Sequence, residues 1–141
     1  MTRDAEPRGG AVSDDAVEHV SVMIVDDQAP FRAAARAVVS RVAGFELVAE
    51  VASGEEAVAV AVDVRPALVL MDINMGELDG IEATRLIVEA NPDTRVILVS
   101  TYGLDDLPPR ARTSGAIAYV NKDELSPRVI RRLWADGGDW S

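Results

Sequence analysis

From Val20 onward, short apolar runs alternate with longer segments whose apolar residues recur at helical spacing. Five of these runs are rich in Val, Ile and Leu and have the length of buried strands. They cover residues 20–25, 45–51, 67–71, 95–99 and 117–120. Strands that alternate with helices are typical of a parallel sheet covered on both faces. We therefore predict an α/β fold with a doubly wound, five-stranded parallel sheet.

Sequence signals also mark the boundaries of the predicted helices. Pro30 suits the first turn of the helix after the first strand, and Gly44 suits a left-handed end for that helix. Ser53, with Glu56 three residues later, predicts a capping box at the start of the second helix. Residues 80–90 form a third predicted helix.

The segment 104–114, where a fourth helix is expected, contains Pro108 and Pro109 in its middle. Proline inside a helix removes a backbone hydrogen bond and clashes with the preceding turn. We expect helical structure only from about Pro108 onward, in a short and loosely docked element. A fifth helix is predicted to start at Ser126 and Pro127, with its apolar residues facing the sheet.

Length and composition favour one domain, because 141 residues with 48% hydrophobic content suit a single globular core. Residues 1–19 are polar without an apolar period and are predicted to be a disordered tail. The domain is expected at 20–137, and 138–141 would be its end or the start of a linker. No apolar run approaches the roughly 20 residues that span a bilayer, and no secretory signal is evident. We expect a cytoplasmic protein that does not contact membranes.

The net charge of -10 disfavours direct nucleic-acid binding by this domain, because an acidic surface repels phosphate backbones. The absence of cysteine excludes disulfides, zinc-thiolate sites and thiol catalysis.

Polar residues follow four of the predicted strands. Asp26 and Asp27 follow the first, Asp72 the third, Ser100 the fourth and Lys122 the fifth. In open α/β sheets, ligands bind beyond the carboxyl ends of the strands, so these residues should converge. Two carboxylates about 4 Å apart repel by about 4 kcal/mol at an effective dielectric of 20. The cluster therefore requires a divalent cation and the ammonium group of Lys122.

Mg²⁺ is the expected cation, with Mn²⁺ as the alternative, because Mg²⁺ accepts carboxylate oxygens and retains positions for water and phosphate. The three aspartates and the backbone carbonyl oxygen of Asn74 are the expected ligands. In this arrangement Asp72 is the nucleophile that accepts a phosphoryl group, and Lys122 stabilises the charge on its oxygens. Ser100 would donate a hydrogen bond to that group.

Five short motifs carry a family resemblance: Val-Asp-Asp at 25–27, Met-Asp-Ile-Asn-Met at 71–75, Leu-Asp-Gly at 78–80, Val-Ser at 99–100, and Tyr-Val-Asn-Lys at 119–122. Together they resemble the receiver domain of two-component response regulators over residues 20–137. The end of the last predicted helix is similar to receivers that precede a helix-turn-helix DNA-binding domain. The resemblance implies a flavodoxin-like (βα)5 fold with strand order 2-1-3-4-5.

The resemblance also implies a role for each matching residue: phosphorylation site Asp72, metal-binding pair Asp26 and Asp27, switch hydroxyl Ser100, switch aromatic Tyr119, catalytic lysine Lys122, and modulating positions Asn74, Thr101 and Tyr102. Such a domain is a signalling domain that assists its own phosphorylation and dephosphorylation, rather than an enzyme.

The implied phosphodonor is a sensor histidine kinase or a histidine phosphotransfer protein. Phosphorylation would switch the surface formed by 104–114, 117–120 and the last helix. The resemblance leaves open a homodimer and, if the chain is a fragment, an attached DNA-binding domain.

Three departures from the receiver pattern concern the output rather than the chemistry. Gly76 and Asp123 stand where receivers often have proline, and Pro108 with Pro109 interrupts the segment used for output.

Other classes remain as alternatives. An Asp-dependent phosphatase would need a second carboxylate at Asn74, and a nucleotide-binding module would need a glycine-rich loop after the first strand. A pseudo-receiver that acts only through interactions, without phosphorylation, keeps the same fold.

Overall fold

The computed structural model of the chain describes residues 19–75, 78–101 and 103–137. The strands in this part are β1 (Val20–Val25), β2 (Phe45–Val51), β3 (Leu68–Asp72), β4 (Arg95–Ser100) and β5 (Ala118–Asn121). The α-helices are α1 (Ala29–Ser40), α2 (Gly54–Val64), α3 (Gly80–Ala90) and α4 (Pro127–Asp136). The predicted tail, apart from His19, and residues 138–141 lie outside the described residues.

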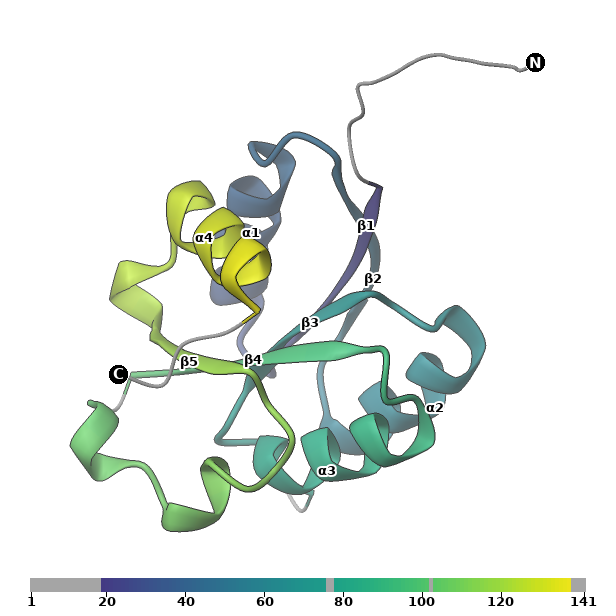
Figure 1. The fold of residues 1–141 in the computed structure, drawn as a ribbon, viewed down its shortest axis with the longest axis vertical. Coiled ribbons are helices and arrows are strands. Elements are labelled where there is room, and N and C mark those ends of the chain that lie inside the picture. Colours follow the sequence, from purple (N-terminus) through teal and green to yellow (C-terminus); the bar gives the residue numbers. More distant parts are fainter. Residues whose placement is uncertain (1–18, 76–77, 102, 138–141) are drawn as a thin grey trace.

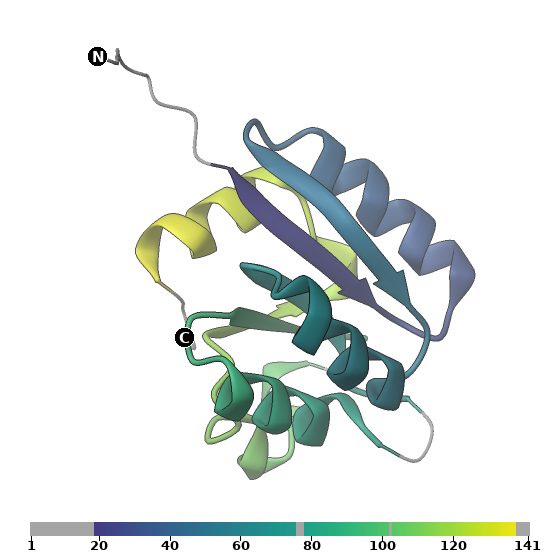
Figure 2. The same ribbon diagram turned by 90° about the vertical axis from the view of Figure 1, so that its right-hand side faces the viewer.

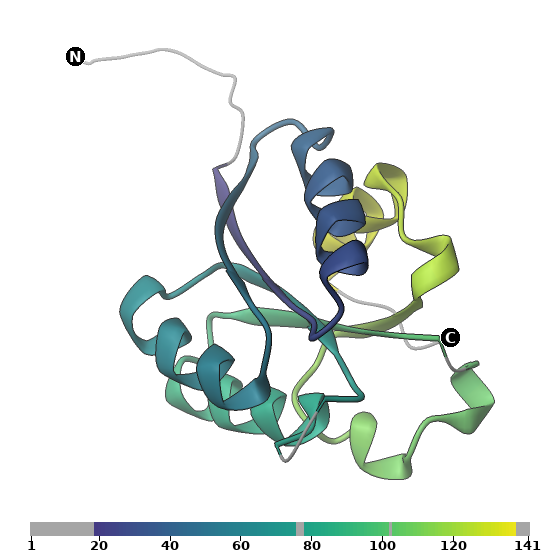
Figure 3. The same cartoon turned by 180° about the vertical axis from the view of Figure 1, so that it is seen from behind.

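The strands form one parallel sheet in the order β2-β1-β3-β4-β5, as predicted. Helices α1 and α4 cover one face of the sheet, and α2 and α3 cover the other (Figures 1 and 3). Figure 2 shows β1 beside β2, with the same division of the helices. The first two strands have the predicted bounds, whereas β3, β4 and β5 each end one residue later than predicted. Asp72 and Ser100 are therefore the last residues of their strands.

Alternate residues of the central strands supply the two halves of the core, because successive side chains of a strand point to opposite faces. The half facing α2 and α3 includes Met23, Val69, Met71, Val96 and Leu98. The half facing α1 and α4 includes Val22, Ile24, Leu68, Leu70 and Ile97, joined by Ile130 and Leu133 of α4. Because the central strands are buried on both faces of the sheet, their ends are held in place. The polar residues that follow these ends are therefore held at one edge of the sheet.

The predicted capping by Ser53 and Glu56 is present at the start of α2, except that Glu56 bonds the residue before the N-cap. The Ser53 hydroxyl accepts a hydrogen bond from the Glu56 N–H at 3.1 Å, and the Glu56 carboxylate accepts one from the Ala52 N–H at 3.0 Å. The prediction that Gly44 ends the first helix is wrong. Helix α1 ends at Ser40, and Gly44 (φ 84°) serves the following turn, where its carbonyl accepts the Val20 N–H.

The segment 104–114 is short and irregular, as predicted, but it is not an α-helix from Pro108 onward. It contains two 3₁₀ turns, η2 (Leu104–Asp106) and η3 (Pro109–Ala111). The predicted fifth helix is therefore α4, and Ser126 caps it by accepting the Val129 N–H at 3.2 Å. None of the helices described is long and apolar enough to cross a membrane.

Candidate functional site

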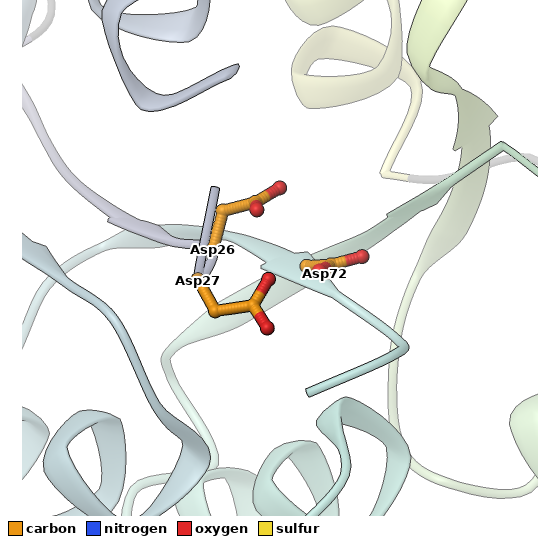
Figure 4. A group of neighbouring side chains, drawn as sticks. All are labelled: Asp26, Asp27 and Asp72. Carbon is orange, nitrogen blue, oxygen red and sulfur yellow. The ribbon is translucent and has the colours of Figure 1, made fainter. Parts of the chain in front are cut away.

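Three aspartates gather at the carboxyl edge of the sheet. Asp26 and Asp27 follow β1 directly, and Asp72 ends the neighbouring strand β3 (Figure 4). One carboxylate oxygen from each lies within 4.8 Å of the others. Asp26 and Asp72 are buried, with exposed fractions of 0% and 4%, whereas Asp27 is exposed. The structure thus brings together the predicted acidic residues.

Lys122 lies against this cluster, at the start of the 3₁₀ turn η4 (Lys122–Glu124). Its ammonium nitrogen is 2.7 Å from Asp26 Oδ2 and 3.7 Å from Asp72 Oδ1. It is the only lysine of the chain, whose other cationic side chains are arginines apart from His19. The cation that contacts the two carboxylates is thus a compact ammonium group, unlike the larger planar guanidinium of the arginines.

The backbone around Asp26 holds that side chain in place. Asp26 Oδ1 accepts the Gln28 N–H at 2.8 Å, and the Asp26 carbonyl oxygen accepts a hydrogen bond from Arg32 at 2.6 Å. Asp26 Oδ2 is buried and, apart from its ion pair with Lys122, has no hydrogen-bond partner of good geometry. This oxygen retains a free lone pair that a cation could use.

Burial raises the pKa of Asp72 from its ordinary value of 3.8 to about 6, and the charge of Asp26 adds to this effect. The charge of Lys122 and the backbone N–H of Asn74, which hydrogen-bonds to Asp72, act in the opposite direction. One ammonium group is therefore insufficient to offset the combined effect of burial and the charge of Asp26 on Asp72.

The donor set fits Mg²⁺, because it offers hard carboxylate oxygens from three residues, including Asp26 Oδ2, which has no partner apart from its ion pair with Lys122. Asp26, Asp27 and Asp72 are the residues that would hold the ion. The Asn74 backbone reaches this region through its N–H bond to Asp72. Ligation by the Asn74 carbonyl oxygen stays a prediction.

Beside Asp72 lies a small cavity of about 110 Å³, large enough for a phosphoryl group with water. Its lining residues come from four strand ends: Gln28, Asp72, Asn74, Ser100, Thr101 and Lys122. The structure thus places Ser100, which is 1% exposed, and Thr101 beside Asp72. Tyr102 and Gly76 lie outside the described residues.

Tyr119 of β5 is half-buried and contacts Ser100, which lines this cavity. Its hydroxyl donates a hydrogen bond to the Ser100 carbonyl oxygen at 3.2 Å. Burial raises the pKa of Tyr119, so its hydroxyl stays protonated and able to donate at neutral pH. The two predicted switch residues are therefore in direct contact.

The sequence interpretation missed two residues of the site and the local role of Asp123. Gln28 and Phe31 both contact the Lys122 ammonium group. Asp123, where receivers often have proline, uses its N–H to bond Asn121 Oδ1 at 2.9 Å, which starts η4. One available signal was that Gln28, the only glutamine in the chain, follows the acidic pair directly.

A larger groove of about 200 Å³ lies between the C-terminal halves of α2 and α3. It is mainly apolar and contains none of the aspartates or Lys122. Charge and chemistry, rather than volume, therefore identify the site at the sheet edge.

Comparison with known proteins is consistent with this geometry. Residues 22–133 match the response regulator receiver domain family. The chain belongs to this family. It is 30% identical to the response regulator GacA of Pseudomonas aeruginosa over 82% of the chain, and 34% identical to the response regulator UvrY of Escherichia coli over 81% of the chain.

These alignments cover 56% and 52% of the two relatives, so the chain spans about half the length of the curated response regulators it matches. A LuxR-family two-component response regulator from Aurantimonas has a similar crystal structure, with a TM-score of 0.75, 28% identity and coverage of 84% of both chains. The response regulator domain of Thermotoga maritima CheB gives a TM-score of 0.68 at 28% identity, over 85% of this receiver and 93% of that chain. The identification from sequence motifs is confirmed.

Proposed function

We propose that this receiver accepts a phosphoryl group on Asp72 in a Mg²⁺-dependent reaction. The donor would be a sensor histidine kinase or a histidine phosphotransfer protein. The observation that carries the proposal is the position of Lys122 between Asp26 and Asp72, within a cluster of three carboxylates that one lysine leaves undercompensated.

The transfer forms a bond from an Asp72 carboxylate oxygen to phosphorus, while the bond from phosphorus to the donor atom breaks. The leaving group departs with the bonding electron pair. When bound, Mg²⁺ supplies charge neutralisation at the carboxylates and the phosphoryl oxygens. Lys122 holds a phosphoryl oxygen by a charge-assisted hydrogen bond. Ser100 and Thr101, which line the cavity, donate further hydrogen bonds.

Output would pass through Ser100 and Tyr119 to the surface formed by 104–114, β5 and α4. Movement of Ser100 toward a phosphoryl group alters the carbonyl oxygen that Tyr119 bonds. The segment 104–114 has two 3₁₀ turns in place of an α-helix, so its backbone hydrogen bonds are short-range ones that oppose a rearrangement weakly. Asn74, Thr101 and Tyr102 would tune the lifetime of the phosphorylated state.

In a longer protein the receiver would control an attached effector domain, since the similar relatives extend well beyond the aligned region. The net charge of -10 suits a domain that does not itself bind DNA. A cytoplasmic location and formation of a homodimer belong to the same proposal, as does Mn²⁺ in place of Mg²⁺.

The alternative is a pseudo-receiver that acts without phosphorylation. Beryllofluoride, a phosphoryl analogue, separates the two functions. We expect it to alter the backbone NMR spectrum of the wild type around Ser100 and Tyr119 when Mg²⁺ is present, and to leave Asp72→Asn unchanged. A wild type that binds neither Mg²⁺ nor beryllofluoride would favour the pseudo-receiver.

A further inference from the structure

The Lys122 ammonium group has two contacts beyond the aspartates, and both come from the start of α1. It donates a hydrogen bond to Gln28 Oε1 at 3.3 Å and lies 4.5 Å from the centre of the Phe31 ring. An ammonium group has three N–H donors, and three acceptors face it here: Asp26, Asp72 and Gln28. Its side chain is only 10% exposed, so these neighbours define its position.

Gln28 occupies the N-cap of α1, yet its side chain makes no capping hydrogen bond. N-cap positions usually hold Ser, Thr, Asp or Asn, whose side chains accept a backbone N–H of the first turn. Here the Gln28 backbone carbonyl accepts the N–H groups of Phe31 and Arg32, both at 3.1 Å, and Pro30 needs no partner. The start of α1 therefore does not depend on the Gln28 side chain, which lines the cavity beside Asp72.

We propose that Gln28 is a positioning residue for phosphoryl transfer to Asp72, acting through Lys122. This inference rests on the proposed function. The ammonium nitrogen lies 2.7 Å from Asp26 and 3.7 Å from Asp72. It is therefore closer to Asp26, although it must act on a group bound at Asp72. The Gln28 amide oxygen is a third acceptor that directs the ammonium without adding charge to a site that already holds three carboxylates. Phe31 covers the ammonium with the face of its ring, which also attracts a cation.

The test compares two substitutions at one position. Gln28→Met keeps the length of the side chain and removes the acceptor, whereas Gln28→Glu keeps an acceptor oxygen at the same reach and adds one negative charge. With acetyl phosphate, we expect the rate of phosphorylation, followed by intact mass, to fall at least fivefold in Gln28→Met. In Gln28→Glu the rate should fall less than threefold, because the test is made at saturating Mg²⁺, which offsets the added charge. The dissociation constant for Mg²⁺ and the melting temperature of Gln28→Met should match those of the wild type.

A second readout needs no turnover. Because Lys122 is the only lysine, protein labelled with ¹⁵N-lysine gives one ammonium resonance. We expect this resonance to shift in donor-free Gln28→Met.

A Gln28→Met variant that reacts at the wild-type rate, or that loses rate only in proportion to a lower melting temperature, would overturn the inference. So would equal losses in both variants, or an unshifted lysine resonance. A wild type that gains no phosphoryl group would instead overturn the proposed function, so the two failures are distinguishable.

Discussion

Gly80 lies against the backbone carbonyl oxygen of Asp72, so closely that a Cβ atom on Gly80 would overlap that oxygen. The Gly80 N–H also donates to the Ile73 carbonyl oxygen at 2.9 Å. The first residue of α3 therefore fixes the backbone that presents the Asp72 side chain. A backbone atom cannot move aside as a flexible side chain can.

This contact predicts that Gly80→Ala is destabilising. We expect the free energy of unfolding to fall by about 2 kcal/mol, because overpacking at a backbone contact forces a local shift. Urea denaturation would measure the change. Gly103→Ala is the matched control, since a Cβ there meets only Asp106 at 3.8 Å. Equal stability of the two variants would contradict the prediction.

Removal of the Asp72 charge should stabilise the metal-free protein. The pKa of Asp72 is about 6 in the folded state against an ordinary 3.8, so the folded state holds the proton more tightly. The stability of the wild type should therefore fall as pH rises from about 4 to about 6 and change little above that range, by on the order of 3 kcal/mol from this group. Asp72→Asn removes this loss.

Urea denaturation in EDTA at pH 4 and pH 8 measures this effect. Asp72→Asn should exceed the wild type in stability mainly at pH 8. The exposed Asp63 of α2 provides the control, and Asp63→Asn should follow the wild type at both pH values. No gain in Asp72→Asn at pH 8 would show that burial does not disfavour the Asp72 charge.

Lys122 should be more important for stability without metal than with it. Lys122→Met leaves the fully buried Asp26 without its counter-charge, and loss of one partner of a buried pair costs about 3 kcal/mol or more. A cation held by the same carboxylates supplies part of that compensation. We expect Mg²⁺ to recover at least half of the stability that the variant loses in EDTA.

Unfolding by urea with and without Mg²⁺ gives the comparison. Arg131→Met, which removes an exposed cation of α4, serves as the control and should show no such metal dependence. If Lys122→Met loses the same stability in both conditions, Mg²⁺ does not share the site with Lys122.

The ion pair between Arg110 and Asp79, at 2.5 Å, joins the η3 turn to the N-cap of α3. Arg110 lowers the pKa of Asp79, so the pair is present above the ordinary carboxyl range and is lost as pH falls. Such a partly exposed pair contributes at most about 1 kcal/mol to global stability. Its local effect should be larger, because the segment 104–114 has little regular structure.

Hydrogen exchange measured by mass spectrometry tests this. Amides of 108–114 should exchange faster than those of α1 and α4, and Arg110→Ala should accelerate them at least threefold at neutral pH. Arg85→Ala breaks a similar ion pair within α3 and should leave 108–114 unchanged. Protection of 108–114 comparable with that of α1 would remove the idea of a loosely held segment.

The fold and the acidic site were predictable because the relevant signals are local. Buried strands appear as apolar runs, and each run ends at a polar residue, as at Asp26 and Asp72. Parallel topology then brings those ends together. The boundary at Gly44 was misassigned because a positive φ can serve either a helix end or the next turn, and local sequence does not separate the two.

The remaining features depend on contacts between distant parts of the chain. The bond from Lys122 to Gln28 joins residues 94 positions apart, and the Arg110–Asp79 pair joins residues 31 positions apart. The proline pair predicts that no regular α-helix passes through Pro108. The turn that forms there also depends on Ala111, which is buried in the core. Local patterns carry no information on such contacts.

The central claim is that Asp72 accepts a phosphoryl group. Intact mass after incubation with acetyl phosphate or phosphoramidate, with and without Mg²⁺, tests it most directly in the wild type and Asp72→Asn. We predict the gain of one phosphoryl group by the wild type only when Mg²⁺ is present, and no gain by Asp72→Asn. Phosphorylation of Asp72→Asn to the same extent, or no phosphorylation of the wild type, would contradict the assignment.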